Sequence, residues 1–119
     1  KSFFDKIGLT IQIKSEKQSI NFWSMSAMMA PYYNMLKTMS EWLIKKGIKR
    51  DDTQKYITSL FSALSEDAVV NSKENLNHLV KDSQTKKGLN EQGLREMKKK
   101  GVYRSIEKTL DIIYRRLDK

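Results

Sequence analysis

The sequence predicts an all-α fold, in which a unit of five or six helices follows a short N-terminal segment with one strand. From residue 16 onward, apolar residues recur every three to four positions in successive stretches, which is the spacing of amphipathic helices. Convincing alternation of apolar and polar residues, the strand pattern, occurs at residues 9–13 alone. A chain of 119 residues, 39% of them hydrophobic, has material for one modest core.

The N-terminal segment reads as the end of a different structural unit. Residues 2–7, SFFDKI, are typical of the last turns of an amphipathic helix that ends at Gly8. Leu9, Ile11 and Ile13 then alternate with polar residues, which predicts a strand with one buried face. Because a single strand cannot pair its own backbone groups, we expect its partners in another part of a longer polypeptide or in another chain.

The middle of the chain predicts two long helices. The stretch INFWSMSAMMA is dense in apolar residues up to Pro31, which should end or kink a helix because proline lacks an amide hydrogen. The next helix is predicted from Tyr32 to about Lys46, with Gly47 closing it. Asp51 or Asp52 is a candidate N-cap for the following helix. That helix has a regular apolar stripe: Ile57, Leu60, Phe61, Leu64 and Ala68.

The C-terminal part predicts three further helices. KENLNHLVKD indicates one short helix, and TKKGLNEQGL, residues 85–94, supplies a turn before a helix from about Leu89 to Lys100. Gly101 is expected to break the chain before a last helix from Val102 to Leu117. Long helices with apolar residues on more than one face usually pack against something besides their own chain. The sequence therefore predicts a dimer.

Composition limits the function classes. The formal charge of +9 is typical of proteins that bind phosphate backbones, but the lysine runs lie on different elements and have no interleaved aromatic residues. We therefore expect a solvated basic surface and no nucleic-acid partner. No apolar run is long enough for a membrane span. The absence of cysteine excludes a disulfide scaffold and a cysteine nucleophile, and it fits a reducing compartment, so a cytoplasmic location is expected.

The sequence offers few residues for catalysis. His78 has no second histidine or cysteine with which to hold a metal, so we interpret it as structural or solvent-facing and expect no metal site. Carboxylates form no close pair for acid–base work, and no glycine-rich dinucleotide fingerprint is present. We expect this chain alone to be inactive and to bind no cofactor.

The order of the segments resembles the C-terminal half of the pyrroline-5-carboxylate reductase family. The resemblance rests on SAMMAPYYNML around Pro31, the spacing to Gly88, and the run from Gly101 to Arg104 that opens the final helix. It implies a two-domain oxidoreductase of proline biosynthesis, with residues 1–15 as the helix–strand end of a Rossmann domain that holds NAD(P)H. Residues 16–119 would be a helical dimerisation and substrate-side domain whose long helices interleave in a homodimer.

The resemblance also implies a substrate site at the turn. In the family, backbone amides of a glycine-containing turn before a helix receive the carboxylate of a small substrate whose C=N bond is reduced. The matching residues would be Thr85, Gly88, Leu89 and Asn90. Gly88 would serve close backbone approach or a positive φ, and Asn90 would be a helix cap or a side-chain donor to substrate.

The turn departs from the family pattern, and three readings stay open. The family run is Ser or Thr, Pro, Gly, Gly and commonly two threonines, whereas residues 85–90 read TKKGLN. Besides the reductase domain, the chain could be a helical dimerisation or interaction module that has lost the active site, with residues 85–90 an ordinary helix-opening loop. A basic nucleic-acid-binding helical domain is the distant alternative.

Overall fold

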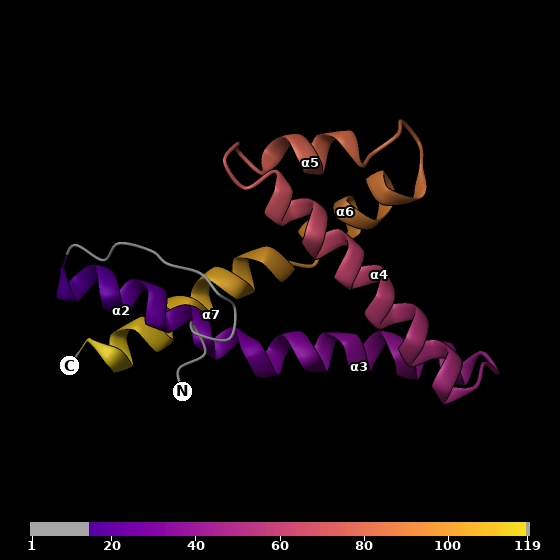
Figure 1. The fold of residues 1–119 in the computed structure, drawn as a ribbon, viewed down its shortest axis with the longest axis horizontal. Helices are drawn as coiled ribbons and strands as arrows, with labels where there is room; N and C mark the ends of the chain where they lie inside the picture. Colours follow the sequence, from indigo (N-terminus) through magenta and orange to yellow (C-terminus); the bar gives the residue numbers. More distant parts are fainter. Residues whose placement is uncertain (1–14, 119) are drawn as a thin grey trace.

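The computed structural model of the chain describes residues 15–118 and shows a helical architecture (Figure 1). The predicted helix end at residues 2–7 and the predicted strand at residues 9–13 lie outside the described residues. Within residues 15–118 no strand is present, which confirms the all-α prediction. The elements are α2 (Glu16–Ser24), the 3₁₀-helix η1 (Met25–Met28), α3 (Met29–Lys45), α4 (Arg50–Val70), α5 (Asn77–Asp82), α6 (Leu89–Lys99) and α7 (Val102–Leu117).

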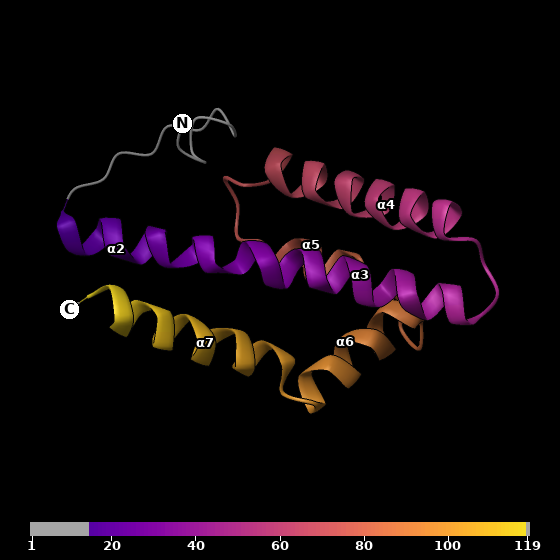
Figure 2. The same ribbon diagram turned by 90° about the horizontal axis from the view of Figure 1, so that it is seen from below.

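The first three elements follow one another in a nearly continuous line (Figure 2). Ser15 caps α2, since its side-chain oxygen accepts a hydrogen bond of 3.1 Å from the Gln18 amide. The helix then tightens into the 3₁₀-helix η1 before α3 begins. We predicted that the break would lie at Pro31 and that the next helix would start at Tyr32, and this boundary is wrong.

The position of Pro31 explains the actual break. Pro31 is the third residue of α3, where an α-helix needs no intrahelical acceptor for the amide, so its missing N–H costs nothing. In a continuous α-helix the same proline would leave the Ala27 carbonyl without a donor and would crowd it. Ala27 lies in η1, so the interruption occurs one turn before the proline.

A tight turn at Gly47 joins α3 to α4. Gly47 has φ of 98°, a left-handed conformation that glycine adopts without a steric penalty. The Gly47 amide donates to the Ile44 carbonyl at 2.9 Å, and the Ile48 amide donates to the Leu43 carbonyl at 3.3 Å. This pair of bonds is the Schellman arrangement that satisfies the last carbonyls of a helix. The predicted helix end at Gly47 is confirmed.

The start of α4 differs from the prediction. Its N-cap is Lys49, and neither Asp51 nor Asp52 caps it; both carboxylates lie in the first turn of the helix. Negative charge there is still favourable, because the N-terminal end of the helix dipole is positive. Arg50, the first helical residue, reaches back to α3, where its Nη1 donates to Glu41 Oε2 at 2.9 Å.

The helices α3 and α4 pack against each other, and their buried residues lie in the halves nearer the Gly47 turn. The buried residues there are Ser40 on α3 and Thr53 and Ile57 on α4. Ser40 and Thr53 are small, so they let the two helices approach each other, and the Thr53 hydroxyl is satisfied by the Arg50 carbonyl at 3.0 Å. Farther from the turn the two helices diverge (Figure 1).

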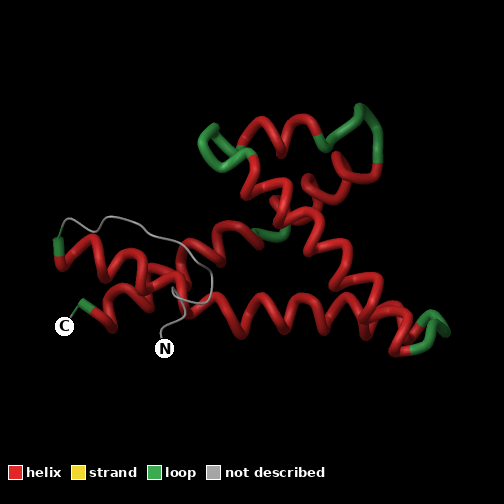
Figure 3. The backbone as a smooth tube through the Cα atoms, in the orientation of Figure 1, coloured by secondary structure: helices red, strands yellow, loops and turns green. Residues whose placement is uncertain are grey.

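The C-terminal helix returns to the beginning of the described chain. After α6, Gly101 takes φ of 75° and redirects the backbone into α7, which confirms the predicted break. The helix α7 runs antiparallel to α2 and contacts both α2 and η1 (Figure 2). Loops connect α3, α4, α5, α6 and α7 in turn (Figure 3).

This arrangement leaves most apolar side chains accessible to solvent. Among the described residues, Ile57 is the one buried hydrophobic side chain, at 6% exposure. Residues of the predicted core stripes are exposed, including Leu64 on α4, Trp42 on α3 and Ile106 on α7. The helices therefore have the predicted amphipathic pattern, but one copy of the chain does not cover their apolar faces. No described helix combines the length and apolar character that crossing a lipid bilayer requires.

The Glu41–Arg50 pair gives a pH-dependent test of the α3–α4 hairpin. The hydrogen bond from Arg50 and its positive charge hold the pKa of the Glu41 carboxyl below its usual value of 4.5. A pKa lowered by folding stabilises the protein above that usual value, and the contribution is lost as the pH falls through the lowered pKa. In an NMR titration of the Glu41 side chain, Arg50→Gln should raise this pKa. Lys55→Gln, which removes the same charge elsewhere on α4, should leave it unchanged; equal effects of the two variants would contradict the hairpin contact.

Candidate functional site

The α5–α6 turn, residues 83–91, contains all the residues that the sequence placed at the substrate site. Ser83 is the C-cap of α5, and Gly88 is the N-cap of α6. The turn is short because the Gly88 amide donates to the Thr85 carbonyl at 2.8 Å. Thr85, Gly88, Leu89 and Asn90 are thus brought together at the start of α6.

Gly88 is required by close approach and not by a positive φ. Its φ of −87° and ψ of 177° are extended values that any residue adopts, so the positive-φ alternative is wrong. A Cβ atom at this position would collide with Thr85 Oγ1 and would lie 2.9 Å from the Thr85 carbonyl oxygen. The close approach is made by the turn's own threonine, which packs over the glycine.

The left-handed residue of the turn is Lys87, with φ of 63°. This conformation is costly for a residue with a Cβ atom, and glycine is the residue that favours it. In the family run compared above, a glycine precedes the glycine that matches Gly88. Lysine therefore stands in this chain at a position whose backbone conformation glycine would adopt without strain.

The Glu91 side chain forms a hydrogen bond with the backbone of the left-handed Lys87. Glu91 Oε1 accepts a hydrogen bond of 2.9 Å from the Lys87 amide. Glu91 is the third residue of α6, so its side chain folds back over the helix start, as in a capping box. Sequence reasoning missed Glu91, although a glutamate three residues after a helix-opening position is the known signal for such a cap.

Asn90 is not the helix cap. It is the second residue of α6, and its side-chain Nδ2 donates to the Ser83 carbonyl at 3.0 Å. This bond ties the start of α6 to the end of α5 and thereby closes the turn. Leu89, by contrast, projects into solvent with 87% of its surface exposed, so its side chain does not contribute to closing the turn.

The backbone amides at the start of α6 could bind an anion, but the Glu91 carboxylate of the protein itself lies close to them. The first amides of an α-helix have no intrahelical acceptor, and Gly88 has no side chain that accepts from those of Leu89 and Asn90. These groups and the helix dipole favour a negative ligand. The Glu91 carboxylate already supplies negative charge there, while the exposed Lys86 and Lys87 side chains supply positive charge nearby.

Other candidate positions are structural. His78 Nδ1 lies 2.9 Å from the Asn75 carbonyl oxygen and its Nε2 lies 3.5 Å from Glu74 Oε2, so the ring helps to order the loop before α5. Residues 15–118 contain no group of His, Asp or Glu side chains suited to a metal ion.

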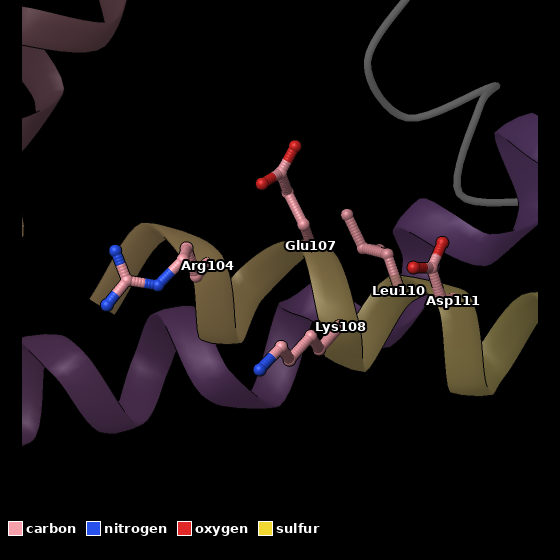
Figure 4. Close-up of a pocket in the computed structure, with 5 residues that line it drawn as sticks. All are labelled: Arg104, Glu107, Lys108, Leu110 and Asp111. Carbon is pink, nitrogen blue, oxygen red and sulfur yellow. The ribbon is translucent and has the colours of Figure 1, made fainter. Parts of the chain in front are cut away.

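A hollow of about 430 Å³ on α7 also lacks a convergent set of groups. Figure 4 shows that its labelled side chains all come from one helix, and that Lys108 points to the opposite side from Glu107.

Comparison with known proteins identifies the family. Residues 20–119 match the family model for pyrroline-5-carboxylate reductase dimerisation. The match covers most of the chain, so the chain belongs to this family of dimerisation domains. Searches of curated proteins and of solved structures found no significant match.

The packing of Thr85 over Gly88 can be tested by comparing Gly88, the N-cap of α6, with Gly93 inside the same helix. Gly88→Ala should destabilise the protein by about 1–3 kcal/mol, because the new methyl group overpacks the turn. Gly93→Ala is the matched control: nothing lies within 4 Å of its added Cβ, so it should stabilise the helix by about 0.5–1 kcal/mol. Chemical denaturation at one protein concentration measures both changes, and a stabilising Gly88→Ala would show that the turn has another shape.

The strain at Lys87 predicts a stabilising substitution. Lys87→Gly should stabilise the protein by about 0.5–1 kcal/mol, because relief of the left-handed conformation outweighs the greater chain entropy of glycine. Lys86→Gly removes the same charge at a residue without positive φ and should destabilise by about 0.4–1 kcal/mol. Thermal unfolding of the two variants at equal concentration gives the comparison. The same sign for both variants would contradict a left-handed Lys87.

Proposed function

We propose that this chain is the dimerisation and substrate-side domain of a pyrroline-5-carboxylate-reductase-like, NAD(P)H-dependent oxidoreductase. The parent protein would reduce the C=N bond of a small carboxylate-bearing substrate in the cytoplasm, as a step of proline biosynthesis or a related reaction. Family membership supports the domain assignment. The substrate, the cofactor and the location are parts of the proposal.

The observation that carries the dimer is the uncovered apolar surface of the helices. Exposure rises along α4 from 6% at Ile57 to 51% at Leu64, and along α3 from 4% at Ser40 to 62% at Tyr33. Between the two helices lies a hollow of about 200 Å³, which is lined in part by Leu36. A groove that widens from a packed end is suited to an amphipathic helix, and a second copy of the chain supplies such helices.

A charge placed in this groove tests the dimer. Leu64→Glu should weaken dimerisation by about 2–4 kcal/mol, roughly 30- to 1000-fold in Kd, because the interface would bury an unpaired carboxylate. Gln92→Glu, which adds the same charge at an exposed polar residue of α6, should leave Kd unchanged. Sedimentation analysis over a range of protein concentrations measures both. A compact wild-type monomer at micromolar concentration would refute the dimer, and a dimer indifferent to Leu64→Glu would place the interface elsewhere.

In the proposed reaction this domain orients the substrate. The amides of Leu89 and Asn90 would receive the substrate carboxylate at the start of α6, with the hydroxyl of Thr85 beside them. NAD(P)H would supply the hydride from the other domain of the parent protein. Residues 15–118 contain no strand that leads into a glycine-rich turn, the element that holds a dinucleotide pyrophosphate, so no step of hydride transfer is assigned to them.

One observation favours a second candidate function. The Glu91 carboxylate accepts from the Lys87 amide, close in the chain to the Leu89 and Asn90 amides that would receive a substrate carboxylate. Two carboxylates at one helix start repel each other, which weakens anion binding. A domain with this feature would also suit a helical dimerisation module that has kept the dimer and lost the active site.

Glu91→Gln in the full-length protein separates the two functions. The amide keeps a hydrogen-bond acceptor for Lys87 and removes the negative charge, so in an active enzyme KM for a cyclic imine carboxylate should fall about threefold to tenfold, on the order of 1 kcal/mol. Glu66→Gln, which makes the same charge change on the exposed surface of α4, should not alter KM. Turnover with equal KM in the wild type and both variants would show that the α5–α6 turn does not bind the substrate. No NAD(P)H-dependent turnover by any of them would favour the inactive module.

A further inference from the structure

We draw no further inference here: the strongest candidate, the apolar groove that widens between α3 and α4 toward Tyr33 and Leu64, restates the dimer surface proposed above, and nothing in the described part of the chain shows a different partner that covers it.

Discussion

The packing of α3 against α4, where Ser40, Thr53 and Ile57 are buried, determines how the long helices of this chain are arranged. Small side chains let α3 and α4 approach there, and the Arg50–Glu41 pair crosses the same end of the hairpin. Since the helices diverge beyond this point, their apolar stripes face solvent in a single copy. Burial of apolar surface is the main favourable term in folding and in association. The apolar surface that one copy leaves exposed can therefore stabilise a complex that buries it. A dimerisation domain follows naturally from such a hairpin.

The α5–α6 turn is held by hydrogen bonds from its own side chains. Lys87 has a left-handed conformation, which costs less for glycine than for lysine. The Glu91 carboxylate satisfies the amide of this strained residue, and the Asn90 side chain fixes the turn to Ser83. These bonds stabilise the turn without any ligand. They also place a negative charge beside the amides proposed to receive a substrate carboxylate, so stability of the turn and affinity for an anion oppose each other.

The place of the α5–α6 turn in the chain was predictable from the sequence, and the contacts of its residues were less so. The helix start at Leu89 followed from local rules, although the expected cap was Asn90 and the actual cap is Gly88. The sequence offered close backbone approach or a positive φ as reasons for this glycine; the backbone angles exclude the positive φ, and the contact with Thr85 was not foreseen. The role of Asn90 was not predictable, because its partner Ser83 lies seven residues away and the distance depends on how α5 meets the turn.

The sequence by itself determined the helices, the ends at Gly47 and Gly101, and the family, because helix periodicity and glycine conformation are set by interactions within a few residues. The tertiary structure decided that Lys87 carries the positive φ, and that Ile57 is buried while Leu64 is not. Each of these depends on how segments distant in sequence, or the two ends of a turn, meet in space. Local propensity favours a helix without specifying which part of its apolar stripe another helix covers.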